Sequence, residues 1–193
     1  MKKQMISKNI ILKEISEYDT DFIVEIRLDE SLNALSKNNI SREIHQKWYE
    51  KYSNNKDDHY FVIFKRNNMQ RIGTIAIFNI DQYSKKAEYG RFILLEDFRI
   101  FALEIELAIL EYGFETLELN KIYGFVRDGD KKIISFNKNI GFKQDGILRE
   151  HYWDSERYVD LYMVSMLKKE YFEYKNTKYL KYYKMIEGLA RIC

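Results

Sequence analysis

The stretch from Lys121 to Phe142 constrains the fold of this chain more than any other part of it. It opens with the aromatic and β-branched residues of a strand, 121–126, which Gly129 and its acidic neighbours end. Apolar residues then recur at helical spacing, namely Ile133, Phe136 and Ile140. A strand at 87–95 and an amphipathic run at 101–114 come before it. The order strand, helix, strand, helix predicts a small-molecule site at the C-terminal ends of the two strands.

Further strands are predicted on both sides of this unit. Residues 8–15, 59–65 and 70–80 precede it, and residues 143–150 and 158–167 follow it, the last two joined by a loop. Helices are predicted at 22–28 and 44–52, with a polar loop at 31–40 between them. Because short turns join the strands at 59–65, 70–80 and 87–95, we expect them to be antiparallel. The fold class is therefore a mixed α/β sheet.

The C-terminal part of the chain is rich in Tyr and Lys and reads as helix. We treat residues 1–168 as one domain and residues 169–193 as a helical extension of it. One apolar helical face is formed by Leu180, Tyr183, Ile186 and Ala190. The extension is either a helix that pairs two copies as a homodimer, a packing element or a lid over the site. We favour packing or pairing, because a solvated helix would not expose so many aromatic rings.

Composition excludes several classes of protein. With 193 residues, 46% of them hydrophobic, the chain has the size of one domain. A formal net charge of +2 gives no reason to expect nucleic acid or an anionic membrane as partner, and no apolar run is long enough to span a bilayer. The basic N-terminus lacks the apolar stretch of a signal peptide, and Cys193 is the single cysteine. We therefore expect a cytoplasmic protein without disulfides. We also expect no metal site, because the three histidines are well separated in the sequence.

Several local motifs resemble the GCN5-related N-acetyltransferase (GNAT) superfamily over about residues 8–168. They are Leu117–Tyr123 (LELNKIY), Val126, Asn139–Phe142 (NIGF), Asp145–Arg149 (DGILR) and Tyr158–Asp160 (YVD). Two others, Ile44–Trp48 and Ala87–Gly90, look like the branch that acetylates amino sugars on nucleotide carriers, of the pseudaminic-acid pathway type. The resemblance implies a mostly antiparallel sheet with one splayed parallel strand pair. It also implies acetyl-CoA as co-substrate, no metal, and a small-molecule amine as acceptor.

By this resemblance, the strand at 87–95 carries the reaction centre. Glu88 is the candidate general base, acting through water. Gly90 would let the strand bulge and splay, so that the backbone N–H groups of Phe92, Ile93 and Leu94 bind the thioester carbonyl. Strict alternation places Glu88, Gly90 and Phe92 on one face and Tyr89 and Arg91 on the other. The alternative for Glu88 is a surface carboxylate paired with a lysine.

The family binds pyrophosphate with a Gln/Arg-x-x-Gly-x-Gly/Ala loop, and here the matching segment is Asp97–Ala102. Ala102 fits the last position, whereas Ile100 replaces a glycine and Asp97 replaces the Gln or Arg. A β-branched residue disfavours positive φ and crowds a phosphate. The segment's cofactor-binding candidates are Arg99, Ile100, Phe101 and Ala102. Arg99 is either a compensating phosphate ligand or a solvated cation.

The helix after the second parallel strand departs from the family twice. Asp130 stands where the family has Asn, and Asn137 stands where it has the Tyr that protonates the leaving thiolate. Asparagine is no general acid, so the proton would come from Tyr123, Ser135 or water. Asp130, Ser135 and Asn137 remain candidates for cofactor binding, and Tyr123 for catalysis.

The resemblance assigns four residues to the acceptor side: His45, Trp48, Tyr89 and His151. A helix face with His, Trp and Tyr is also typical of a protein core, and His151 also fits a surface turn. Two other functions stay open. One is N-terminal acetylation of a ribosomal or other protein, and the other is a non-catalytic protein that keeps the fold without binding acetyl-CoA.

Overall fold

The computed structural model describes residues 3–29, 32 and 40–189. The loop predicted at 31–40 therefore lies mostly outside the described residues, as do Ala190 and Cys193. The strands are β1 (Gln4–Ile6), β2 (Ile10–Glu14), β3 (His59–Lys65), β4 (Gln70–Asp81), β5 (Lys86–Leu94), β6 (Lys121–Arg127), β7 (Lys143–Trp153) and β8 (Tyr158–Leu167). The helices are α1 (Thr20–Leu28), α2 (Arg42–Tyr52), α3 (Ala102–Glu111), α4 (Lys131–Ile140), α5 (Lys168–Lys175) and α6 (Lys178–Leu189). Three short helical turns are η1 (Glu17–Asp19), η2 (Glu96–Phe101) and η3 (Tyr112–Thr116).

The strands form a single twisted sheet in the order β1-β2-β3-β4-β5-β6-β8-β7. The strands pair antiparallel except β5 and β6, which are parallel because α3 crosses over between them. This parallel pair is the one predicted from the strand, helix, strand, helix order. The predicted fold class is therefore confirmed.

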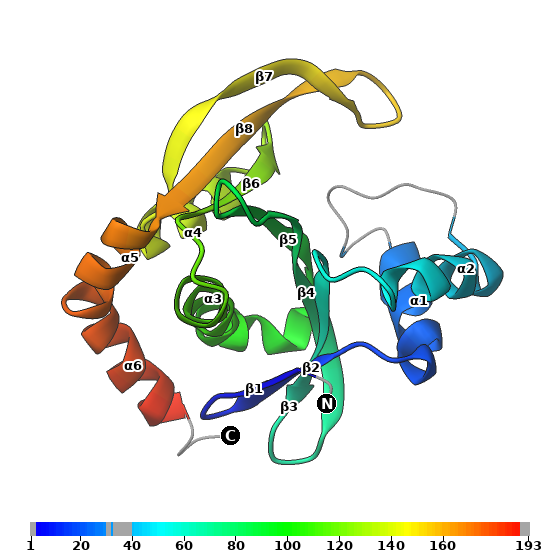
Figure 1. The fold of residues 1–193 in the computed structure, drawn as a ribbon, viewed down its shortest axis with the longest axis horizontal. Helices are drawn as coiled ribbons and strands as arrows, with labels where there is room; N and C mark the ends of the chain where they lie inside the picture. The colour runs from blue at the N-terminus through cyan, green and yellow to red at the C-terminus, as the bar shows by residue number, and fades with distance from the viewer. Residues whose placement is uncertain (1–2, 30–31, 33–39, 190–193) are drawn as a thin grey trace.

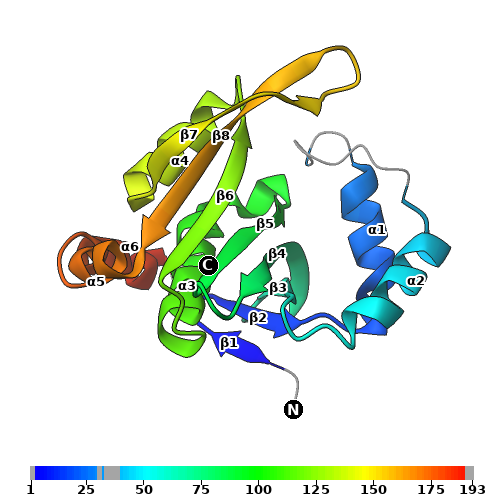
Figure 2. The same cartoon turned by 45° about the horizontal axis from the view of Figure 1, so that its top comes forward.

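Helices cover both faces of the sheet, so there are two hydrophobic cores. The larger core lies between the sheet and α3, with α4, α5 and α6 closing it (Figure 1). The smaller core lies on the opposite face under α1 and α2 (Figure 2). Its buried residues are Ile15, Ile23, Tyr52, Tyr60, Val62 and Ala76. One face of the sheet is thus covered by α3, α4, α5 and α6, and the other face by α1 and α2.

Local sequence signals explain where two key helices begin and end. Ser41 caps α2, since its Oγ accepts a hydrogen bond from the backbone N–H of Ile44 at 3.3 Å. Gly141 ends α4 with a φ of 124°, a conformation that a residue with a Cβ rarely adopts. A Cβ at Gly141 would also lie 2.4 Å from the ring of Tyr174. This glycine therefore fixes both the end of α4 and the approach of α5.

The C-terminal extension is part of the main core rather than a separate layer or a lid. Tyr179 and Ile186 are buried, and Tyr182 and Tyr183 are partly buried against α3 and α4. The predicted face was wrong at Leu180, which is 53% exposed. In both views α5 and α6 lie on the opposite side of the molecule from α1 and α2 (Figures 1 and 2).

Two further strand predictions need correction. The chain forms a short N-terminal strand, β1, that the sequence pattern did not indicate. Strand β7 continues to Trp153, so His151 lies in a strand rather than in a loop. The register of β7 against β8 shifts between Leu148 and Tyr152, and pairing resumes at Tyr152 with Val159. The strand therefore continues beyond the residues whose apolar and polar side chains alternate.

Candidate active site

The candidate site begins where β5 and β6 part. Their ladder contains three residue pairs, of which Glu88 with Tyr123 is the last. Beyond that pair β5 runs on to Leu94 and β6 to Arg127, yet no described strand pairs with the edge of β5 that faced β6. Backbone N–H and C=O groups in the interior of a sheet require partners. The opening therefore presents hydrogen-bonding groups to a ligand.

A β-bulge in β5 lies at this opening, as the glycine had suggested. Thr74 pairs with Ile93 and Ala76 pairs with Gly90, so Arg91 and Phe92 together face a single residue of β4. Arg91 takes a φ of 49°, and its carbonyl oxygen accepts a hydrogen bond from Thr74 Oγ1 at 3.0 Å. This bond fixes the bulge from the neighbouring strand.

The bulge corrects the faces that alternation had assigned. Arg91 lies on the face of Glu88, toward α1 and α2, whereas Phe92 and Leu94 pack on the main core under α3. Arg91 and Phe92 have thus exchanged sides, because one extra residue shifts a period-two pattern by one position. Ile93 is buried, pairing with Thr74. Of the three residues predicted to supply backbone donors, Phe92 lies in the bulge, and Ile93 and Leu94 follow it.

Glu88 and Tyr123 lie side by side at the point of parting. Burial raises the pKa of the Glu88 carboxyl above its ordinary value, and a hydrogen bond of 3.1 Å from Asn79 Nδ2 only partly offsets this. Burial also raises the pKa of the Tyr123 phenol, with a further contribution from the Glu88 charge. A half-buried carboxylate of raised pKa is a better proton acceptor than a solvated one.

Arg91 sits in a box of aromatic rings on the same face. Its guanidinium lies 4.2 Å from the ring centre of Phe78, 5.3 Å from that of Tyr60 and 5.5 Å from that of Trp48. Its Nη1 donates to Oδ1 of the buried Asp58 at 2.8 Å. Sequence reasoning missed this cluster, because it joins four separate segments of the chain: Trp48, the Asp58–Tyr60 segment, Phe78 and Arg91.

Tyr89 points to the opposite face and lies inside the main core. Its ring stacks on Phe142 with centres 5.0 Å apart and occupies the space beside Gly124, where a Cβ would come within 2.6 Å of it. Its hydroxyl donates to Oδ1 of Asn137 at 2.5 Å, and both residues are buried. Tyr89 is thus turned away from the acceptor side to which we had assigned it.

A buried carboxyl, Glu106 on α3, lies near this pair and was not foreseen. Its side chain is 2% exposed, and its Oε2 has no hydrogen-bond partner among the residues that the structure describes. Burial raises its pKa to about 8. It interacts electrostatically with the phenols of Tyr89 and Tyr179. The C-terminal helices cover this side of α3, which is why a charged residue in an amphipathic pattern ends up in the interior.

The segment predicted to bind pyrophosphate forms η2, directly before the N-terminus of α3. Ile100 is 53% exposed, and Arg99 is an exposed residue whose Nη1 lies 3.3 Å from the carboxylate of Glu96. Ala102 donates its N–H to the carbonyl of Arg99, closing the last turn. The segment therefore offers a cation and a helix N-terminus, but its amides are engaged in a 3₁₀ turn.

The remaining cofactor-binding candidates are spread apart. Phe101 is buried in the main core beside Phe98. Asp130 precedes the first turn of α4 and accepts a hydrogen bond from Arg127 at 3.3 Å. Ser135 is exposed on α4, whereas Asn137 is buried, so these two lie on different faces of the helix.

The acceptor-side candidates are likewise divided. His45 is 2% exposed and its Nδ1 lies 3.2 Å from Thr20 Oγ1, whereas its Nε2 has no hydrogen-bond partner within the described part of the chain. Burial, and then Arg27, lower its pKa to about 4, so the ring is neutral at pH 7. Trp48 is half-buried in the smaller core and forms part of the Arg91 box. His151 is exposed on the β7–β8 hairpin.

A sheet that opens between one parallel pair, next to a bulge and a helix N-terminus, defines the class of protein. The profile of the acetyltransferase (GNAT) domain matches residues 9–143, more than half of the chain, and the chain belongs to this family. In the described part, no group of three or more His, Cys, Asp or Glu side chains is placed to hold a metal ion. No helix of that part is long and apolar enough to cross a membrane.

Curated relatives match part of the chain. An uncharacterized N-acetyltransferase, p20 of Bacillus licheniformis, is 32% identical over 112 residues, 58% of this chain and 63% of that protein. A putative ribosomal N-acetyltransferase of Bacillus subtilis is 31% identical over 100 residues, 51% of this chain and 55% of that protein. A spermidine N(1)-acetyltransferase of Vibrio cholerae is 29% identical over 101 residues, 52% of this chain and 58% of that protein. The matches therefore span between 55% and 63% of the relatives' own length.

A solved structure confirms the fold. The spermidine N-acetyltransferase of Vibrio cholerae in complex with CoA and spermine superimposes with a TM-score of 0.81. The likeness covers 86% of this chain and 99% of the other, at 22% identity. At that identity the likeness establishes the architecture alone.

Proposed function

We propose that this chain is an acetyl-CoA-dependent N-acetyltransferase that acts on the primary amine of a small acceptor. One observation carries the proposal: Glu88 and Tyr123 lie together at the point where the parallel ladder ends and the sheet opens. The unpaired edge of β5 accommodates an extended thioester arm, and the N–H groups of Phe92–Leu94 are placed to bind its carbonyl oxygen. Membership of the acetyltransferase (GNAT) domain family supports this assignment.

Each residue then has a defined role. Glu88 removes a proton from the acceptor ammonium, directly or through water, and its raised pKa suits this task. The amine nitrogen forms the new bond to the acyl carbon while the carbon–sulfur bond breaks. The departing thiolate takes a proton from Tyr123 or from water. The Ala102 N–H is already bonded to the Arg99 carbonyl, so the positive end of the α3 dipole and the guanidinium of Arg99 hold the pyrophosphate by charge.

For the acceptor we propose a nucleotide-linked amino sugar. The Arg91 box supplies aromatic rings on the Glu88 face, and such rings suit the planar base of a nucleotide. Two named relatives suggest other acceptors, a polyamine and a ribosomal protein.

The test has two stages. Calorimetric titration with acetyl-CoA and CoA is expected to give micromolar binding, and failure to bind at millimolar ligand would establish the non-catalytic alternative. Acetyl transfer is then measured to a uridine-diphosphate amino sugar, to spermidine and to a basic N-terminal peptide. Glu88→Gln is expected to lower kcat roughly 100-fold or more while leaving acetyl-CoA binding unchanged. Glu50→Gln, an exposed change on α2, is the matched control.

A further inference from the structure

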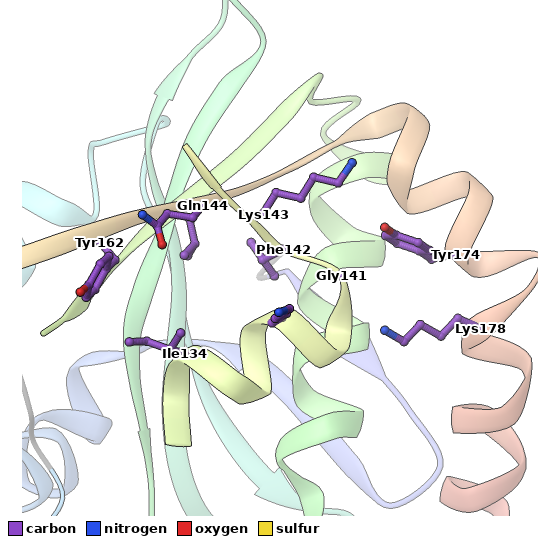
Figure 3. A pocket seen from close by; sticks show the side chains of 10 residues that line it. Ile134, Gly141, Phe142, Lys143, Gln144, Tyr162, Tyr174 and Lys178 are labelled. Carbon is purple, nitrogen blue, oxygen red and sulfur yellow. The ribbon is translucent and has the colours of Figure 1, made fainter. Parts of the chain in front are cut away.

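A groove of about 510 Å³ lies on the far flank of α4 from the opening between β5 and β6. It is bounded by α4, the turn at Gly141, the paired strands β7 and β8, the end of α5 and the start of α6 (Figure 3). The two flanks of α4 are distinct, because Asn137 is buried and bonded to Tyr89 whereas the adjacent Lys138 lines the groove. Its volume is within the range of small-molecule sites.

The two ends of the groove differ in chemistry. Tyr174 and Lys178 lie at the end formed by the C-terminal helices, and Tyr162, Gln144 and Ile134 lie at the other (Figure 3). The buried Phe142 and Val164 contribute apolar surface between them. The Tyr162 end therefore offers aromatic, apolar and amide groups, and the other end offers the Lys178 ammonium beside the Tyr174 ring.

The charge of this lining is one-sided. Three lysines line the groove, and no lining residue is acidic. Lys143 is neutralised by Glu170, whose Oε1 lies 2.7 Å from its Nζ. Neither Lys138 nor Lys178 forms an ion pair with any residue that the structure describes, and the Lys178 ammonium instead lies 5.7 Å from the ring centre of Tyr174. Two ammonium groups thus remain available for an anion.

We infer that this groove is a second binding site, for a nucleoside phosphate. Its phosphates lie at Lys138 and Lys178, and its base lies at the Tyr162 end, where the Gln144 amide can both donate and accept a hydrogen bond. A simple anion would leave the apolar lining unused, and an apolar ligand would make no use of the two ammonium groups. Only a ligand with both parts matches both ends. This inference does not depend on the proposed acetyl transfer.

Isothermal titration with ADP tests the inference, with adenosine and inorganic phosphate as part-ligands. ADP is expected to bind one-to-one, more tightly than either part-ligand. The Lys138→Gln/Lys178→Gln double variant is expected to weaken ADP binding roughly tenfold. Lys181→Gln/Lys184→Gln removes two exposed lysines of α6 outside the groove and is expected to bind like the unmodified protein. Equal binding by both double variants would overturn the inference, as would no binding at millimolar ADP.

A second measurement separates this site from the nucleotide part of CoA. Titrating ADP into protein saturated with acetyl-CoA is expected to leave ADP affinity unchanged, because α4 lies between the two sites. Competition between ADP and acetyl-CoA would place ADP in the opening of the sheet and overturn the inference. In backbone NMR spectra, ADP is expected to shift the amides of Gly141 and Gln144 and to leave that of Phe92 in place. The reverse pattern would likewise contradict it.

Discussion

The hydroxyl of Tyr89 on β5 donates a 2.5 Å hydrogen bond to the side chain of Asn137 on α4. The strand and the helix belong to opposite sides of the opening in the sheet, so this bond joins the two. Both partners are buried, and burial raises the pKa of the phenol well above its ordinary value. The pair is thus a neutral, desolvated hydrogen bond across the base of the candidate site.

Removing this hydroxyl is expected to destabilise the protein. In Tyr89→Phe the Asn137 oxygen stays buried without its donor, which costs about 1–3 kcal/mol. Chemical denaturation monitored by tryptophan fluorescence measures the loss. Tyr123→Phe is the matched control, because the Tyr123 hydroxyl forms no hydrogen bond with any residue that the structure describes and the partly exposed phenol can reach water. Equal stability of Tyr89→Phe and the unmodified protein would show that the bond contributes nothing.

Gly124 is expected to tolerate no side chain while Tyr89 is present. In Gly124→Ala the new Cβ lies 2.6 Å from the Tyr89 ring, and such overpacking costs about 1–3 kcal/mol. Gly188→Ala on α6 meets no atom within 4 Å and is expected to stabilise by about 0.5–1 kcal/mol. Thermal unfolding of both variants checks the opposite signs. The double variant Gly124→Ala/Tyr89→Leu is expected to recover part of the loss, and no recovery would refute the steric explanation.

The stability of the protein is expected to fall as the pH rises toward 8. Glu106 has a folded-state pKa of about 8 against an ordinary 4.5, so the folded chain binds the extra proton between these values. Each pH unit in that window removes at most about 1.4 kcal/mol. His45, with its pKa lowered to about 4, has the opposite effect below its ordinary 6.5. His59, whose pKa is also lowered by burial, acts in the same direction as His45. A comparison with a variant that lacks only the Glu106 carboxyl therefore isolates Glu106.

The variant Glu106→Gln tests this assignment, since an amide of similar shape cannot ionise. Its free energy of unfolding is expected to match that of the unmodified protein more closely at pH 6.5 than at pH 8, where the variant is the more stable. Glu50→Gln, at an exposed position, is expected to follow the unmodified protein throughout. Parallel curves for Glu106→Gln and the unmodified protein would count against a buried, protonated carboxyl.

Restoring a glycine in η2 is expected to strengthen acetyl-CoA binding. Ile100→Gly makes positive φ accessible and removes an exposed branched side chain, which we expect to lower the Kd roughly fivefold. Ile100→Ala removes most of the bulk without freeing the backbone, so calorimetry on both variants separates the two effects. If neither variant binds more tightly, the segment does not limit affinity.

Much of this fold was readable from the sequence because local signals and tertiary packing agree. The strands at His59–Lys65 and Tyr158–Leu167 coincide with their apolar runs, and the Ser41 cap marks the start of α2. The parallel pair follows from the strand, helix, strand, helix order. These features depend on short-range patterns, which a single sequence records.

The parts that sequence could not supply depend on contacts between distant segments. The bulge at Arg91 adds one residue without altering composition, so the faces after Gly90 were assigned the wrong way round. Tyr89 is buried because Gly124, far along the chain, leaves room for its ring. Glu106 is buried because α6 covers α3. Each of these features is decided by residues that are close in the folded structure but distant in the sequence.

The short ladder between β5 and β6 also has a mechanical consequence. Because three residue pairs join β5 to β6, the backbone ladder between the strand groups β1–β5 and β6–β8 is short, and the two groups can move relative to each other about it. A ligand that contacts both strand groups adds hydrogen bonds along the open edge of β5 and stabilises the β5–β6 ladder against local opening. Amide hydrogen exchange in the β5–β6 ladder should therefore slow when the site is occupied, whatever molecule fills it.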